Sequence, residues 1–124
     1  MNDTRRMLAA ATLLTVTLVT SGPRQAASET NEPQVVSVTA ERFAFTPSEI
    51  RLRAGIPAEI RLRSDDTAHG FHVAGTDIDV VIPKRGRGEA VVKVDLDPGR
   101  YEFECSQICG AGHDFMRGVL IVAK

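Results

Sequence analysis

Tryptophan is absent from the 124-residue sequence, and aromatic residues as a whole make up only 5% of it. An excess of one charge is also missing, because 15 basic residues face 16 acidic ones and the net charge is −1. This balance lacks the basic footprint of a nucleic-acid-binding protein, so no nucleic-acid partner is expected. The length allows one domain without a large substrate pocket, so no catalytic site is expected within the chain.

The sequence has no apolar run as long as a membrane-spanning helix, which needs about 20 residues. Its longest apolar run, Met7 to Val19, follows two arginines and precedes small and helix-breaking residues, which is the layout of an export signal. We therefore predict a helical signal peptide or short membrane anchor over residues 1–28 and a linker over 29–33. The remaining domain, 34–124, is expected in the periplasm or at the outer face of the cytoplasmic membrane.

A helical period of 3.6 is missing after this leader, and short alternating segments separated by turn residues predict an all-β sandwich or barrel. Segments 49–53 and 59–63 put Ile and Leu on one face and charged residues on the other, as in half-buried antiparallel strands. Turns are expected at 54–57, between these two strands, and at 97–99. The arginines of the two strands indicate a solvated sheet face. The predicted strands are 34–40, 49–53, 59–63, 69–73, 79–82, 89–96, 101–105 and 119–122.

The rare residue types converge in one segment between two predicted strands, Cys105-Ser-Gln-Ile-Cys109-Gly-Ala-Gly-His113-Asp-Phe-Met116. Thiolate and thioether sulfur are soft ligands that select copper, and imidazole also accepts copper. Cys109, His113 and Met116 supply three ligands of a mononuclear blue-copper site, which a second His would complete. Cys105 has no place in such a site, but a second thiolate in a loop that folds back can bridge two metal ions.

Three other interpretations of this segment are open at this point. A pair of Cys in an exported protein often forms a disulfide, although that bond leaves His113 and Met116 unexplained. A structural zinc site uses Cys and His but has no need of a thioether. A Cys nucleophile with His113 as its base lacks a third, orienting residue. Covalent haem is excluded, because the sequence has no C-x-x-C-H run.

The second imidazole must come from His69 or His72, in the upstream segment Asp66-Thr-Ala-His69-Gly-Phe-His72-Val73. These two residues have opposite parity along a strand, so only one of them is expected to reach the metal. Strand alternation alone does not decide which one it is.

Three motifs together resemble the copper-A (CuA) domain of cytochrome c oxidase subunit II, and among its members the ba-type oxidases most closely. They are the C-S-Q-I-C-G-x-G-H-x-x-M loop, the upstream H-G-F-H-V and the P-G-x-Y-x-F-x-C run. The resemblance covers about 34–124 and implies a cupredoxin-like Greek-key β-sandwich with a metal loop at one end. It also implies a binuclear centre of two copper ions. The implied ligands are His69, Cys105, the backbone carbonyl of Gln107, Cys109, His113 and Met116.

The function implied by the resemblance is one-electron transfer from a redox protein, either a cytochrome c or a cupredoxin, to a terminal oxidase or reductase. Two coppers that share one electron spread the change of charge over many bonds, so little geometry changes on reduction. His113 is expected at the exterior of the loop, where electrons enter or leave. An exported copper chaperone or assembly factor with the same ligands is the alternative function.

The sequence also predicts where several residues near these ligands lie and what they do. Ile108, Ala111 and Phe115 are expected either to form a docking patch or to pack around the metal. Many members of the family use a Trp for electron uptake, and here Phe71 lies in the matching segment. His72 is expected beside the site or at the surface, without contacting the metal.

Overall fold

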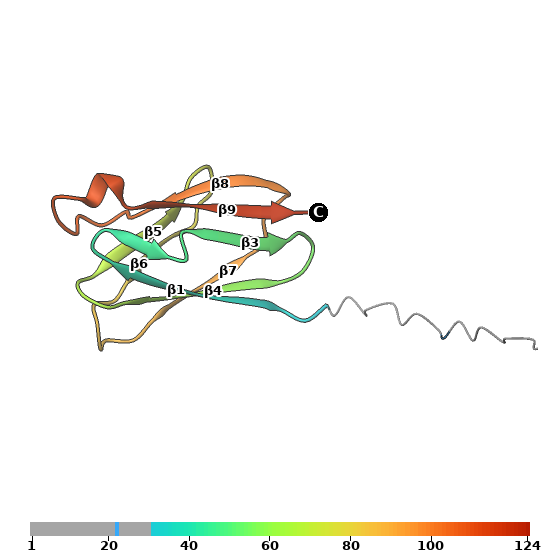
Figure 1. Ribbon diagram of the computed structural model, residues 1–124, viewed down its shortest axis with the longest axis horizontal. Coiled ribbons are helices and arrows are strands. Elements are labelled where there is room, and N and C mark those ends of the chain that lie inside the picture. The colour runs from blue at the N-terminus through green and yellow to red at the C-terminus, as the bar shows by residue number, and fades with distance from the viewer. Residues whose placement is uncertain (1–21, 23–30) are drawn as a thin grey trace, which may run out of the picture.

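The computed structural model describes Gly22 and residues 31–124 (Figure 1). The predicted leader, 1–28, and the first part of the linker therefore lie outside the described residues, Gly22 excepted. Over the part of the chain that is described, no helix has the length and apolar character needed to cross a membrane.

Nine strands within residues 31–124 form two sheets that pack face to face, as the all-β prediction requires (Figure 1). One sheet has four strands in the order β2-β1-β4-β7, and the other has five in the order β3-β9-β8-β5-β6. The pairs β1 with β4 and β3 with β9 are parallel, and the other pairs are antiparallel. The strands are β1 Gln34–Glu41, β2 Ala44–Thr46, β3 Glu49–Arg53, β4 Ala58–Ser64, β5 His69–Val73, β6 Asp79–Ile82, β7 Ala90–Val94, β8 Gly99–Glu104 and β9 Arg117–Ala123.

The predicted strands are all present, three of them with the predicted ends, while the three-residue strand β2 was not predicted. The relation between β3 and β4 was predicted wrongly. They do not form an antiparallel pair: β3 pairs in parallel with β9, and β4 pairs in parallel with β1. Alternation fixes which face of a strand is buried, and two strands on opposite sides of one core show the same alternation as two neighbours. The turn at 54–57 therefore crosses from one sheet to the other.

Arginines of β3 and β4 lie on the solvent face of their sheets, as predicted. Arg51 pairs with Glu49 at 2.6 Å, and Arg61 pairs with Glu59 at 2.8 Å. Pairs this exposed contribute little stability, so their main effect is to keep the sheet faces soluble.

The core between the sheets is centred on three phenylalanines. The ring of Phe103 lies 4.9 Å from that of Phe71 and 5.2 Å from that of Phe45, measured between centroids. Burying one such side chain stabilises the fold by roughly 2–3 kcal/mol. Phe71 is fully buried, so the aromatic residue that occupies the segment of the missing Trp packs into the core and does not reach the surface.

The predicted ligands lie at one end of this sandwich. Strand β8 ends at Glu104, β9 begins at Arg117, and β5, which pairs with β8, begins at His69. The loop 105–116, called the ligand loop below, therefore leaves and re-enters the same sheet. Figure 1 shows this loop at the end of the molecule opposite the C-terminus.

Candidate metal centre

The ligand loop is closed at its base by the backbone. The Cys105 N–H donates to the Met116 carbonyl at 3.0 Å. Within the loop, the one-turn 3-10 helix His113–Phe115 turns the chain back, and the Phe115 N–H donates to the Gly112 carbonyl at 3.0 Å. Within this closed loop the two Cys and the Met are buried, and His113 is half-buried.

The two thiols lie side by side and are not joined by a disulfide. Their Sγ atoms are 3.6 Å apart, whereas a disulfide holds its sulfurs at about 2.05 Å. Both residues are buried, at 4% exposure. The pair is therefore available as two thiol donors, which is not the arrangement that the disulfide interpretation requires.

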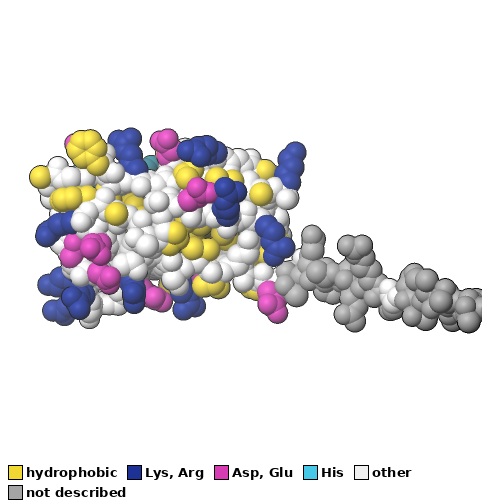
Figure 2. Space-filling view, in the orientation of Figure 1, with side chains coloured by type: hydrophobic (Ala, Val, Ile, Leu, Met, Phe, Trp, Pro, Cys, Tyr) yellow, Lys and Arg dark blue, Asp and Glu magenta, His cyan; other side chains and the backbone are white. Residues whose placement is uncertain are grey.

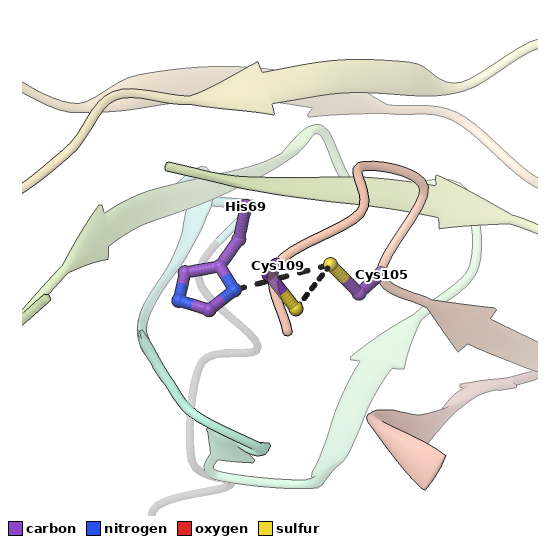
Figure 3. A group of neighbouring side chains, drawn as sticks. All are labelled: His69, Cys105 and Cys109. Atoms are coloured by element: carbon purple, nitrogen blue, oxygen red, sulfur yellow. Dashed lines mark hydrogen bonds between the residues drawn. The ribbon is translucent and has the colours of Figure 1, made fainter. Parts of the chain in front are cut away.

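The imidazole of His69 points at these sulfurs from the first residue of β5 (Figure 3). Its Nδ1 lies 3.9 Å from Cys105 Sγ, and its Nε2 lies 2.7 Å from Asp66 Oδ1. Because the carboxylate accepts the proton of Nε2, the lone pair of Nδ1 is free on the side of the sulfurs. His69, Cys105 and Cys109 bring one ligand atom each to within 4.8 Å of one another.

The other predicted donors surround the same sulfur pair. His113 Nδ1 lies 3.7 Å and Met116 Sδ 3.9 Å from Cys109 Sγ. The carbonyl oxygen of Gln107 lies 3.1 Å from Cys105 Sγ. Met116 is fully buried, whereas His113 is half-buried at the rim, where the sequence led us to expect it. All six predicted donor groups thus lie at or beside the same pair of sulfurs.

His72 lies on the opposite face of β5 and takes no part in this cluster. Its Nδ1 is 3.0 Å from the carbonyl oxygen of Ile78, and it faces Asp79 and Glu104 across the two neighbouring strands. The opposite parity of the two His along the strand separates them as predicted.

The pKa of the Cys109 thiol is raised to about 11, first by burial and then by the hydrogen bond and charge of Cys105, while the Arg42 charge opposes the rise. Burial by itself would also raise the pKa of Asp66, but this effect is outweighed. Hydrogen bonds from the Arg42 backbone, from His69 and from the Thr67 backbone lower the pKa of Asp66 to about 2. Near neutral pH the Cys109 thiol is therefore protonated and the Asp66 carboxylate is ionised.

Three residues that the sequence analysis did not single out support the cluster. Asp66 orients His69, and the Arg42 Nε donates to the Cys109 carbonyl at 2.8 Å. The N–H of Gly70 lies 3.4 Å from Cys105 Sγ, and a Cβ on Gly70 would lie 2.7 Å from the Gln107 backbone nitrogen. A carboxylate three residues before a ligand His was a usable signal for Asp66. Arg42 gives no local signal, because 67 residues separate it from Cys109.

Apolar side chains of the ligand loop project into solvent. Ile108 is 92% and Phe115 84% exposed, and Ala111 is exposed as well. Figure 2 shows hydrophobic side chains protruding at this end of the molecule. Of the two expectations for these residues, packing around the metal is therefore wrong for Ile108 and Phe115, and a surface patch remains. We call these three residues the loop patch.

Cavities open at both ends of the described sandwich. One of about 510 Å³ lies at the end opposite the ligand loop and is lined mainly by apolar residues such as Pro33, Ile56 and Val94. At the cluster, an open cavity of about 370 Å³ lies between Glu104, His113 and Arg117. The donor set of two thiols, two imidazoles, a thioether and a carbonyl fits copper, because soft sulfur and imidazole together select it.

Residues 9–122 match the family of cupredoxin-like domains. Two cytochrome c oxidase subunit 2 proteins of Thermus thermophilus are 38% identical to the chain over 104 residues. The chain is a cupredoxin of the cytochrome c oxidase subunit 2 family. The matched residues make up 82% of this cupredoxin and 76% and 61% of the two relatives, so it spans less than two thirds of the longer one.

Solved structures also include chains that are similar to this cupredoxin in fold and sequence. A heme-copper terminal oxidase dimer solved by cryo-EM contains a chain 29% identical, with a TM-score of 0.64, over 86% of this cupredoxin and 76% of that chain. The metal-binding domain of a Cu(I)-exporting P-type ATPase from Streptococcus pneumoniae, solved with Cu(I), is 26% identical, with a TM-score of 0.57. That match covers 74% of this cupredoxin and 87% of the bacterial domain.

Proposed function

We propose that this cupredoxin is a one-electron carrier whose six donor groups hold a binuclear copper centre. The observation that supports the proposal most directly is the buried pair of unbonded thiols. Their Sγ atoms lie 3.6 Å apart, and each has an imidazole nitrogen less than 4 Å away. Copper bound there supplies a one-electron couple. The ligands in the proposal are His69, Cys105, the Gln107 carbonyl, Cys109, His113 and Met116.

The chain's own contribution to electron transfer is a stiff ligand frame. His69 is anchored by β5 and Asp66, and both ends of the ligand loop are joined by the hydrogen bond from Cys105 to Met116. Ligands that are held rigidly keep the same geometry in both oxidation states of the copper centre. This favours fast electron exchange over the binding of a substrate.

The proposed partners are redox proteins on both sides of the relay. The electron donor is a cytochrome c or a cupredoxin, and the acceptor is a terminal oxidase or reductase. The names of the relatives support an oxidase as the acceptor. Because His113 is half-buried at the rim and the loop patch is exposed on the same loop, this end is where we propose that partners dock.

The proposed location is outside the cytoplasm, in the periplasm or at the outer face of the cytoplasmic membrane. Residues 1–28 would act as a signal peptide or short anchor, 29–33 as a linker, and 34–124 as the copper domain. Mass spectrometry of the protein purified from membranes and from the periplasm would identify the mature N-terminus and test this division.

Copper stoichiometry and spectroscopy test the proposed centre. We expect two copper ions per chain, a purple mixed-valence species and an electron paramagnetic resonance signal shared by both ions. One copper with a blue, mononuclear spectrum would contradict the proposal. Cys105→Ser should reduce the site to one copper or none, while His72→Ala, which removes an imidazole outside the cluster, should leave the purple centre intact.

Copper delivery is the second candidate function. Similarity to the Cu(I)-loaded domain of an exporting ATPase favours it, because a similar fold there carries copper as cargo. A chaperone should pass Cu(I) to a copper-free oxidase domain and should not accept electrons from a reduced cytochrome. Electron uptake with retention of both copper ions would exclude this second function.

A further inference from the structure

The turn between β1 and β2 lies directly beneath the ligand loop. This turn consists of Arg42 and Phe43, since β1 ends at Glu41 and β2 begins at Ala44. The Phe43 ring fills the space below the loop glycines: a Cβ on Gly112 would lie 2.3 Å from that ring. The loop therefore rests on a part of the chain that is more than 60 residues away in sequence.

Arg42 contacts both halves of the proposed metal site. Its side-chain Nε donates to the Cys109 carbonyl at 2.8 Å, on the side of the loop. Its backbone N–H donates to Asp66 Oδ2 at 2.9 Å, and the other oxygen of that carboxylate binds His69 Nε2 at 2.7 Å. Arg42 thus links the Cys109 backbone to the imidazole of His69 through three hydrogen bonds.

The guanidinium also places a positive charge next to the backbone of a ligand. Arginine stays protonated at any ordinary pH, so this charge is permanent. Reduction adds one electron to a centre and lowers its charge by one. A nearby cation therefore stabilises the reduced form relative to the oxidised form and raises the reduction potential.

We propose that Arg42 is a positioning residue that locks the ligand loop against the Asp66–His69 pair and holds the reduction potential of the site high. The part concerning the potential rests on the proposed function, whereas the part concerning the loop does not. The carrier takes its electron from the donor protein and passes it to the acceptor, and Arg42 alters the driving force of both steps without taking part in either.

Two substitutions at Arg42 separate its roles. Arg42→Gln removes the charge, and Arg42→Lys keeps a cation that can donate to the same carbonyl. Arg53→Gln is the matched control, because Arg53 is an exposed residue at the end of β3, which is paired with Ala123 at the far end of the sandwich.

In the copper-free protein, we expect Arg42→Gln to speed amide hydrogen exchange in segment 105–116 by about tenfold, as measured by mass spectrometry. In the loaded protein, we expect its affinity for Cu(I), measured against bicinchoninate, to fall on the order of 10- to 100-fold. The midpoint potential should fall as well. Arg42→Lys should restore most of the potential, and Arg53→Gln should match the wild type in all three measurements.

The proposal is overturned if Arg42→Gln retains wild-type exchange in the loop, or if Arg53→Gln lowers the potential equally. A wild-type protein that binds one copper or none would instead contradict the binuclear centre. The exchange experiment on the copper-free protein still decides the positioning role in that case, so the two failures are distinguishable.

Discussion

At the scale of single residues, the environment of His69 decides what its two ring nitrogens do. A ligand His can present either nitrogen, and the partner of the other nitrogen selects which one. Here Asp66 takes Nε2 and leaves Nδ1 directed at the sulfurs. The sequence predicted a His ligand from this strand and carried a signal for Asp66, but it was the folded geometry that showed which ring nitrogen the carboxylate takes.

The lowered pKa of Asp66 predicts that the protein is less stable in acid. Its pKa is lowered to about 2 from an ordinary 3.8, so its contribution to folding is complete above the ordinary value and is lost as pH falls through the folded one. As the pH falls from about 4 to about 2, we expect the copper-free protein to lose about 2 kcal/mol of unfolding free energy through protonation of Asp66. Urea unfolding at a series of pH values measures it.

The matched pair of variants for this test is Asp66→Asn and Asp77→Asn. Asp77 is an exposed turn residue, so its variant should keep the wild-type pH profile. Asp66→Asn should flatten the profile in the acid range. Identical profiles for both variants would show that the carboxylate of Asp66 is not the group responsible.

The raised pKa of Cys109 predicts how copper binding depends on pH. A thiol with a pKa of about 11 is protonated at neutral pH, so a metal ion that binds the thiolate must release its proton. We expect the affinity for Cu(I) to rise roughly tenfold per pH unit, for each thiol proton released, between about pH 6 and about pH 8. Competition with a chelator of calibrated pH dependence measures this slope.

Cys109→Ser provides the comparison for this slope, because it removes the thiol whose pKa is raised. The slope should fall by about one proton per copper-binding event. An affinity that does not change with pH would mean that the thiols are already ionised in the metal-free protein.

At the scale of elements, the site depends on the close approach of β5 and the ligand loop. Gly70 makes this approach possible, because a Cβ at this position would lie 2.1 Å from Ser106 Oγ and 2.8 Å from the Ser106 backbone nitrogen. Ser106 is held in place from the other side, where its hydroxyl donates to Asp79 Oδ1 at 2.6 Å. An added methyl group at position 70 would therefore have to displace the backbone of the ligand loop and disturb this hydrogen bond.

Gly70→Ala should consequently displace the ligand loop. We expect a loss of about 1–3 kcal/mol in unfolding free energy, together with a weakened or altered copper spectrum. Gly99→Ala is the control on the neighbouring strand β8, where the added Cβ would meet Tyr101 at an ordinary 3.5 Å. Wild-type copper binding and stability in Gly70→Ala would contradict this tight contact.

Strand positions were largely predictable from the sequence, and strand partners were not. Alternation of Ile and Leu with Arg located β3 and β4, since burial alternates along each strand as the pattern requires. The same pattern cannot say which sheet a strand joins, because both sheets face one core. Strand β2 escaped prediction because three residues are too few to show a period.

At the scale of the whole molecule, the loop patch distinguishes one end of the sandwich from the rest. The predicted apolar neighbours of the ligands turned out to face solvent, which the sequence left open between packing and docking. A loop that folds back on itself gives no alternating pattern from which exposure can be inferred. The folded geometry alone assigns these side chains to the surface.

Removing this patch tests its role in partner binding. We expect the double variant Ile108→Ser and Phe115→Ser to slow electron exchange with a redox partner by roughly tenfold, because the apolar contact area is lost. The copper spectrum and the midpoint potential should stay unchanged. Stopped-flow kinetics with a reduced cytochrome c measures the rate.

Val91→Ser is the control for this experiment, since it removes an exposed apolar side chain from β7 of the other sheet. Its exchange rate should equal that of the wild type. Equal slowing by both variants would indicate a general effect of surface composition and would argue against docking at the loop.

Strand β9 runs antiparallel to β8, away from the ligand loop, and places the C-terminal end of the domain opposite that loop. This strand starts at Arg117, beside the ligand loop, and carries the chain to Ala123 at the opposite end (Figure 1). Strand β1 begins at the same end as Ala123, and there the Gln34 N–H donates to the Pro57 carbonyl at 2.8 Å. A tag, fusion partner or electrode linker joined before residue 34 or after residue 123 is thus attached at the end opposite the ligand loop. The loop then remains exposed to the solution and to partner proteins.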